Sequence, residues 1–225
     1  FNVQVAENLY MRRDYMDTIF KTIRESDLNP RLEYKYSDLP YYILKKYLEA
    51  KFGKRMELIV QENLYESLGA NYTTYLPLEK FSKDNIPPTE QDNIFRNQKV
   101  QGYVHDQGAA MLGGVSGHAG LFSNANDVAK IMQAYLNGGS YGGEKFLDKE
   151  TINKYNTCYY CEDDVRRGVG FDKPQLGASG PTCNCVSMTS FGHSGFTGTF
   201  AWADPEEEIV YVFLSNRTFP DSNNR

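Results

Sequence analysis

The 225 residues carry 24 Lys and Arg against 29 Asp and Glu, which gives a formal net charge of −5. Hydrophobic residues make up 40% of the chain and aromatic residues 14%, too much apolar material for a disordered protein. The chain has no basic block, so a nucleic-acid partner is excluded, because phosphate binding needs clustered Lys and Arg. The longest apolar run, 209–214, is too short to cross a bilayer. We therefore expect a soluble globular protein with no transmembrane segment.

The first half of the chain predicts three helices. Apolar residues recur at helical spacing over 14–28, and Asn29-Pro30 ends that run. A second helix begins after Ser37-Asp38, where Asp38 can serve as the cap and Pro40 fits the first turn. A third runs from 56 to 68 and closes at Gly69. For the second helix the predicted buried stripe is Ile43, Leu44, Tyr47 and Leu48.

The rest of the chain changes in character. From 71 to 107 the pattern breaks down and predicts a long irregular crossing over the surface. The glycine-dense turn 113–120 leads into a helix that Gly138-Gly139 stops, and a short helix is expected near 148–155. Residues 197–203 and 208–214 read as two strands of an antiparallel hairpin. We predict an α+β fold, with helices packed on an antiparallel sheet.

Two segments are candidates for chemistry. Tyr36-Ser37-Asp38 stands at a predicted helix start, where the positive end of the helix favours a phenolate that could shuttle a proton. As three residues alone, they fit an ordinary helix cap better. Residues 191–199 place three glycines beside His193, so that main-chain N–H groups could face a developing oxyanion. A tight turn with a surface histidine explains the same residues equally well.

Two further histidine motifs favour structural explanations. Ser116 and His118 are two residues apart in the glycine-dense turn, and this spacing alone does not make a catalytic dyad. We interpret them as part of a structural turn. His105-Asp106 could belong to a metal site or a triad, but a hydrogen bond within a loop is the simpler interpretation.

The four cysteines form two close pairs, Cys158 with Cys161 and Cys183 with Cys185. They predict two disulfides in an oxidising compartment, and a Cys₄ zinc site in a reducing one. Pairing within Cys183-Asn-Cys185 would be strained, so the disulfide model favours bridges that cross between the two pairs. Apart from this zinc alternative, no cofactor is expected.

Taken together, these motifs resemble the serine β-lactamase and penicillin-binding-protein superfamily, in particular its class C and esterase-like branch. Tyr36-Ser37-Asp38 is similar to the family's Tyr-x-Asn motif, with Asp in place of Asn. His193-Ser194-Gly195 is similar to its Lys-Thr-Gly motif in the His-x-Gly form. Residues 102–106 and 112–123 are similar to segments of other members, as is 192–199 with Trp202 and Asp204-Pro205 behind it. The resemblance extends from the start of the chain to Arg217.

The resemblance implies an enzyme that forms an acyl intermediate on peptide, amide or ester bonds of cell-wall or small ester substrates. Tyr36 would relay a proton, and Asp38 would hold polar groups of the substrate or the nucleophile's Lys. His193 would orient the acyl group, beside Ser194 and Gly195 of the substrate-binding turn. The N–H of Phe196 would supply half of an oxyanion hole. The same resemblance implies a bacterial, exported protein, periplasmic or at the cell surface, sometimes fused to a glycoside hydrolase module.

One departure from the family is plain in the sequence. The nucleophile of the family lies in Ser-x-x-Lys, upstream of the Tyr motif, and no Ser here has a Lys three residues later. We therefore expect residues 1–225 to be a single partial domain of a longer protein, inactive alone and completed by the rest of its own chain. Two alternatives stay open. One is a non-catalytic module that binds peptidoglycan or protein, and the other is a zinc-stabilised interaction domain.

Overall fold

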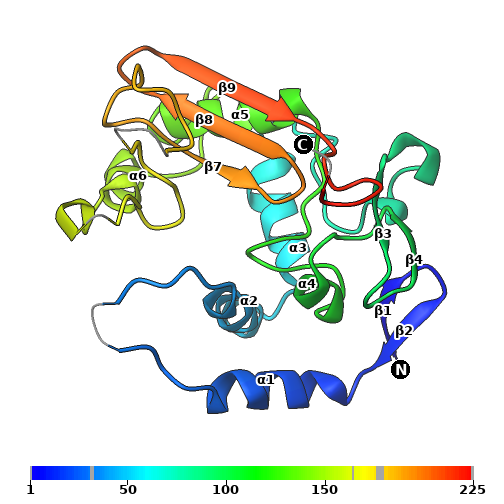
Figure 1. Ribbon diagram of the computed structural model, residues 1–225. Coiled ribbons are helices and arrows are strands. Elements are labelled where there is room, and N and C mark those ends of the chain that lie inside the picture. Colours follow the sequence, from blue (N-terminus) through cyan, green and yellow to red (C-terminus); the bar gives the residue numbers. More distant parts are fainter. Residues whose placement is uncertain (1, 31–32, 164, 176–179, 224–225) are drawn as a thin grey trace. The chain divides into compact units, whose positions relative to one another are not determined.

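The computed structural model describes residues 2–30, 33–163, 165–175 and 180–223. The chain divides into two compact units, each with its own buried apolar cluster. The first unit comprises Phe1–Gln61, Thr74–Phe122 and Asn216–Arg225, and the second comprises Glu62–Thr73 and Ser123–Ser215. Helices and antiparallel sheets make up both units (Figure 1), which confirms the predicted α+β class.

The first unit is built from hairpins and helices around a small core. Its elements are β1 (Asn2–Ala6), β2 (Leu9–Arg12), α1 (Tyr15–Glu25), α2 (Leu39–Phe52), α3 (Met56–Val60), the 3₁₀ turns η2 (Pro77–Glu79) and η3 (Lys83–Asn85), β3 (Pro88–Asp92), β4 (Gln98–Gln101) and α4 (Gln107–Met111). Strand β1 pairs with β2, and β3 with β4, both antiparallel. Val5, Val104, Ala109 and Ala110 form the buried cluster where α4 packs on β1. After α3 the chain continues as a π-helical turn, η1 (Gln61–Tyr65).

Helix α2 begins where the sequence predicted, with Asp38 at its N-cap, and ends at Gly53 in the left-handed conformation (φ 62°). Its predicted buried stripe is wrong, because Ile43, Leu44 and Tyr47 are 47%, 50% and 57% exposed. The buried residues of α2 are Tyr42 and Lys45. Lys45 donates to the carbonyl of Leu112 (3.1 Å), so polar partners decide which face of α2 turns inward. Burial lowers the pKa of Lys45.

The segment 71–107 is more ordered than predicted, since it contains the β3–β4 hairpin. The fully buried guanidinium of Arg96 organises its turn: it donates to the Asp92 carboxylate (2.7 Å) and to the carbonyls of Val104 (2.6 Å) and His105 (2.8 Å). The C-terminal segment follows β3 (Figure 1), where Thr218 donates to the carbonyl of Thr89 (2.8 Å). The buried charges of Arg96 and Asp92 are tolerated because the two side chains pair with each other.

The second unit is a three-stranded antiparallel sheet with helices. Its elements are α5 (Ala125–Leu136), β5 (Ser140–Tyr141), β6 (Glu144–Lys145), α6 (Lys149–Asn156), the 3₁₀ turn η4 (Cys161–Asp163), β7 (Phe191–Gly195), β8 (Thr199–Asp204) and β9 (Ile209–Leu214). The strand order is β7-β8-β9, and the predicted hairpin is β8–β9. Met132 of α5 packs with Phe191 and Ala203 in the core.

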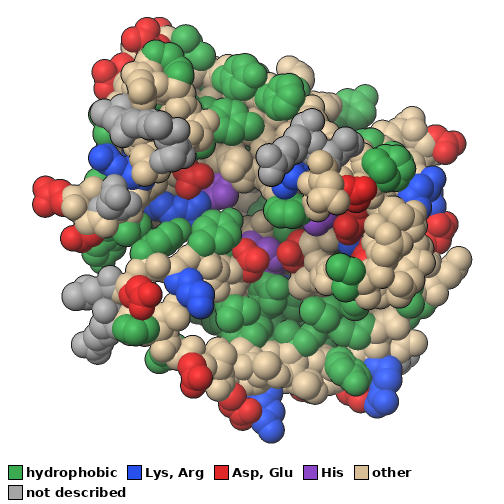
Figure 2. Space-filling view, viewed as in Figure 1, with side chains coloured by type: hydrophobic (Ala, Val, Ile, Leu, Met, Phe, Trp, Pro, Cys, Tyr) green, Lys and Arg blue, Asp and Glu red, His purple; other side chains and the backbone are tan. Residues whose placement is uncertain are grey.

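The surface of the sheet is rich in apolar side chains (Figure 2), and Ile209, Tyr211 and Phe213 of β9 are 55%, 55% and 52% exposed. In the described part of the chain, no helix has the length and apolar character needed to cross a membrane.

Candidate functional site

The Tyr36-Ser37-Asp38 motif lies at the start of α2, as predicted. The Tyr36 side chain is 61% exposed, and the hydroxyl of Ser37 accepts a hydrogen bond from the N–H of Leu39 (3.3 Å). Asp38 occupies the N-cap position, but its carboxylate makes no cap hydrogen bond. The carboxylate therefore stays available for other contacts, close to the positive end of the helix.

Asp38 lies beside a second carboxylate and a histidine. One oxygen of Asp38, one oxygen of Asp106 and one ring nitrogen of His118 are all within 4.8 Å of one another. Carboxylates and imidazole are suitable ligands for several divalent metals. Within the described ranges this is the set of residues that could hold a metal ion. The ring nitrogen Nε2 of His118 is already engaged, since it lies 2.9 Å from Oδ1 of Asp106.

Asp106 joins α4 to this cluster. Its Oδ1 accepts hydrogen bonds from the N–H of Ala109 (2.6 Å), as the N-cap of α4, and from His118. Burial alone would raise the pKa of Asp106, but the hydrogen bonds from His118 and Ala109 outweigh it, and the pKa is lowered. Asp106 is therefore ionised at neutral pH.

An ionised carboxylate can only accept, so Nε2 of His118 carries the proton. The other nitrogen, Nδ1, lies 2.9 Å from the hydroxyl oxygen of Ser116, with which it shares a hydrogen bond. The three residues form a hydrogen-bonded chain from Ser116 through His118 to Asp106, in which His118 donates to Asp106. Ser116 is only 1% exposed, so its hydroxyl is closed to a substrate. The structural interpretation of Ser116 holds, but the sequence analysis missed the chain, because Asp106 lies 12 residues before His118.

Tyr42 of α2 covers the His118 ring, with ring centroids 4.9 Å apart. Burial, followed by the charges of Asp106 and Asp38, raises the pKa of Tyr42 to about 12. Its hydroxyl passes so close to Gly108 that a Cβ on that glycine would lie 1.7 Å from the oxygen. Gly108 is thus required by packing on Tyr42.

His105, the neighbour of Asp106 in the sequence, lies beside a carboxylate of β3. Its Nε2 lies 3.3 Å from Oε2 of Glu90, a residue of β3. Glu90 also accepts from Arg96 (2.6 Å), so His105 belongs to the polar network of the β3–β4 hairpin. The predicted loop hydrogen bond of Asp106 exists, but its partner is His118.

His193 lies on β7, opposite Ala201 of β8, and its side chain is 35% exposed. Its Nδ1 is 2.7 Å from the carbonyl of Ser194, and its Nε2 is 2.6 Å from Nη2 of Arg167. The sequence analysis did not connect Arg167 with His193, because the two residues are 26 positions apart. Tyr36 belongs to the first unit and His193 to the second, so their shared cleft stays a prediction.

Ser194 and Gly195 form the exposed end of β7, and Phe196, the residue after it, is 62% exposed. A Cβ on Gly195 would lie 2.1 Å from Oγ1 of Thr199, and one on Gly192 would lie 2.2 Å from the carbonyl oxygen of Ala201. These glycines are therefore explained by the close approach of β8. The substrate-binding role of the turn stays a prediction.

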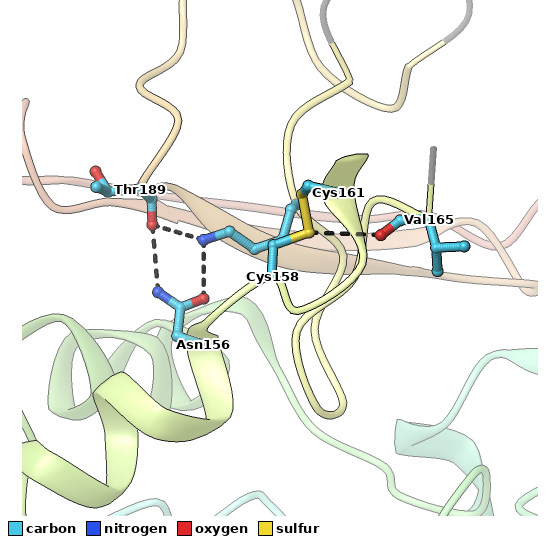
Figure 3. The surroundings of a disulfide bond; sticks show 6 residues. Asn156, Cys158, Cys161, Val165 and Thr189 are labelled. Carbon is cyan, nitrogen blue, oxygen red and sulfur yellow. Dashed lines mark hydrogen bonds between the residues drawn. A yellow bond between two sulfur atoms is a disulfide. The ribbon is translucent and has the colours of Figure 1, made fainter. Parts of the chain in front are cut away.

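The cysteines form disulfides within each pair, Cys158–Cys161 and Cys183–Cys185. The predicted cross-pairing is wrong: the Cα atoms within the pairs are 5.5 and 5.3 Å apart, inside the usual range for a bridge. Figure 3 shows Cys158–Cys161 beside Asn156, which donates to the carbonyl of Thr189 (3.2 Å). In this state the sulfur atoms bind one another, and the zinc alternative would require reduced thiolates.

The chain is similar in sequence to known proteins and in fold to solved structures. A "Putative D-alanyl-D-alanine carboxypeptidase" of Escherichia coli K12 is 35% identical over 204 residues, which cover 85% of this chain and 46% of that protein. A protein of the same description from Salmonella gallinarum is 33% identical over 231 residues, covering 96% and 52%. The chain thus spans about half the length of these relatives.

The fold is similar to that of a penicillin-binding-protein homologue from Caulobacter crescentus, with a TM-score of 0.62 and 19% identity over 90% of this chain and 58% of that one. The Beta-lactamase family model matches residues 3–225. The chain therefore belongs to the β-lactamase family, within the superfamily of serine β-lactamases and penicillin-binding proteins.

Proposed function

We propose that these 225 residues are part of a serine hydrolase that works through an acyl-enzyme on peptide, amide or ester bonds. The observation that carries the proposal is the family match over residues 3–225, together with relatives named as carboxypeptidases. The proposed substrates are cell-wall peptides, with small esters as a second class. A cell-wall substrate places the protein outside the cytoplasm, in the periplasm or at the cell surface.

The proposed nucleophile lies in chain outside these 225 residues, because none of their serines is followed by Lys at the third position. Tyr36 would relay the proton of that serine, from the exposed position before α2. The Asp38 carboxylate, which makes no cap hydrogen bond, would hold the lysine that accompanies the nucleophile. The N–H of Phe196 would stabilise the oxyanion of the tetrahedral intermediate.

Covalent labelling tests this proposal. The complete protein and the 225-residue chain are treated with a fluorescent penicillin and, separately, a fluorophosphonate. We expect stoichiometric labelling of one serine in the complete protein and none in the shorter chain, because acylation needs the nucleophile. Labelling of a serine within residues 1–225 would contradict the assignment. D-Ala-D-Ala peptides and short-chain esters then distinguish the two substrate classes.

The absence of Ser-x-x-Lys within these residues favours one second candidate, a non-catalytic module that binds peptidoglycan. This candidate predicts no covalent label on the complete protein, but sedimentation with insoluble peptidoglycan. The two candidates thus give opposite results in the labelling experiment.

A further inference from the structure

The surroundings of His193 are set by a backbone pairing that precedes β7 in the chain. Arg167 pairs with Asp172, and Asp172 pairs with Gly192, both as antiparallel bridges. The N–H of Asp172 donates to the carbonyl of Gly192 (2.8 Å), and the N–H of Gly192 donates back (3.2 Å). Arg167 and Asp172 are therefore placed beside His193 by paired backbone.

The hydrogen bonds of the His193 ring assign its proton. The carbonyl of Ser194 can only accept, so Nδ1, 2.7 Å away, carries a hydrogen. A guanidinium can only donate, so Nε2 of His193, 2.6 Å from Nη2 of Arg167, carries none. The ring is therefore neutral, with its proton on Nδ1.

Asp172 holds the guanidinium in this position. Nε of Arg167 donates to Oδ1 of Asp172 at 2.9 Å, and Nη2 lies 2.6 Å from the same oxygen. The side chains of Arg167 and Asp172 are 20% and 22% exposed. Partial burial strengthens such a pair relative to one at the open surface. The guanidinium lies between the carboxylate and the ring, and Oδ2 of Asp172 is 4.0 Å from Nε2 of His193.

We propose that Arg167 is a positioning residue, which holds His193 as the neutral Nδ1–H tautomer. That tautomer donates to the carbonyl of Ser194 and so fixes the turn at the end of β7, two residues before the N–H of Phe196. The link from this turn to turnover rests on the proposed hydrolase function. The tautomer itself does not depend on it.

The tautomer of His193 can be measured directly. Long-range ¹H–¹⁵N correlation spectra of the complete protein, labelled with ¹⁵N-histidine, report which ring nitrogen carries the proton. His193→Gln removes one ring system and so assigns the His193 signals. We expect the proton of His193 on Nδ1 at neutral pH. A proton on Nε2, or on both nitrogens, would overturn the proposal.

Three variants test the role of Arg167. Arg167→Met removes the donor and leaves Asp172 as the charged neighbour of Nε2, while the carbonyl of Ser194 still faces Nδ1, so Nε2 should gain a proton. Arg167→Lys keeps a cationic donor and should keep the wild-type tautomer. Arg166→Met removes the same charge from the preceding residue and serves as the matched control. An unchanged tautomer in Arg167→Met, with circular dichroism equal to the wild type, contradicts the positioning role.

Kinetics of the complete enzyme provide the second measurement. Loss of the residue that positions His193 should lower kcat roughly tenfold or more in Arg167→Met. Arg167→Lys should restore most of this loss. The expected tautomer shift with unchanged kcat would overturn the link to turnover. The expected tautomers in a complete protein that turns over neither peptides nor esters would support the assignment of His193 and contradict the proposed hydrolase function.

Discussion

His118 in the first unit and His193 in the second are both histidines, but the partner of Nε2 has opposite charge: a carboxylate in the first and a guanidinium in the second. Ionised Asp106 accepts from Nε2 of His118 at 2.9 Å, and Nδ1 of that ring lies 2.9 Å from the hydroxyl of Ser116. Arg167 donates to Nε2 of His193 at 2.6 Å, and Nδ1 is the donor. Nε2 is therefore the donor in the first ring and the acceptor in the second. The charge of the partner at Nε2 decides between them: a carboxylate draws the proton to Nε2, and a guanidinium excludes it.

The two settings also differ in what they can do. The His118 ring is 5% exposed and joins a buried serine to the N-cap of α4, so it stabilises the first unit. The His193 ring is 35% exposed, on a strand whose exposed end leads to Phe196. A histidine next to serine and glycine in the sequence is thus no evidence of catalysis by itself. What distinguishes the two histidines is the exposure of the ring and the identity of a hydrogen-bond partner that is distant in the sequence.

The largest expected effect concerns Tyr36, and it tests whether the first unit contributes to chemistry in addition to stability. Tyr36→Phe in the complete protein should lower kcat by roughly 10²–10⁴-fold, as expected for a lost proton relay. Tyr34→Phe is the matched control, because Tyr34 is also about half exposed, at 50%. Steady-state hydrolysis of a peptide or ester substrate measures both variants. Equal kcat values for Tyr36→Phe and the wild type would remove Tyr36 from the mechanism.

The next effect concerns the carboxylate beside His118. Asp106→Ala removes the cap of α4 and the acceptor of His118, and should lower the free energy of unfolding by about 3 kcal/mol. Asp148→Ala is the control, since Asp148 is the N-cap of α6, but its side chain is 70% exposed and makes no cap hydrogen bond.

For Asp148→Ala we expect a change below about 0.5 kcal/mol. Urea unfolding of the complete protein, followed by tryptophan fluorescence and circular dichroism, measures both variants. Similar losses for the two would mean that the chain from Ser116 to Asp106 adds no stability beyond an exposed cap.

Local sequence patterns predicted the helices and the β8–β9 hairpin well, because their apolar spacing and glycine stops act within a few residues. The inward face of α2 could not be predicted in this way. Lys45 turns inward to the carbonyl of Leu112, 67 residues later in the chain, whereas the more apolar Ile43 and Leu44 turn outward. The β3–β4 hairpin was missed because its strands, Pro-Thr-Glu-Gln-Asp and Gln-Lys-Val-Gln, are mostly polar, and a buried arginine organises their turn.

The candidate site was predicted only in part, for the same reason. Tyr36 and Asp38 are recognisable from the sequence, since a helix start is a local feature. Neither Asp106 as the partner of His118 nor Arg167 as the partner of His193 is local. An ordinary arginine in an Arg-Arg-Gly segment gives no signal of the histidine that it contacts. Only the backbone pairing of Asp172 with Gly192 brings it there.

The next prediction compares the two units by their response to pH. Hydrogen bonds from Arg96 and from main-chain N–H groups outweigh the burial of Asp92 and lower its pKa from 3.8 to about 2. The unfolded chain binds this proton more readily, so about 2 kcal/mol of stability, present above pH 4, should be lost as the pH falls through 2. In the second unit, burial lowers the pKa of Lys173 from 10.5 to about 8. Between pH 8 and 10.5 the unfolded chain binds more protons, and stability should rise with pH.

Hydrogen exchange resolved by residue separates these two effects. Amides of the β3–β4 hairpin should lose protection at the acid end. In Asp92→Asn the protection of these amides should be lower already at neutral pH, and the further loss at acid pH should be absent. Amides of β7 and β8 should gain protection at the alkaline end, and Lys173→Met should abolish that gain. An alkaline gain that persists in Lys173→Met would contradict the assignment to this lysine.

The smallest effect concerns the disulfides, which are present in the second unit only. Both bridges are local, with sequence separations of 3 and 2, and a short loop restricts the unfolded chain little. Each should therefore contribute on the order of 2 kcal/mol or less, measured as the shift in urea midpoint between Cys183→Ser/Cys185→Ser and the wild type. Thiol titration of the unreduced, denatured protein should find no free cysteine among the four. Peptide mapping should recover 158 linked to 161 and 183 linked to 185, whereas peptides linked between the pairs would restore the cross-pairing, and one equivalent of zinc with four thiols would restore the metal site.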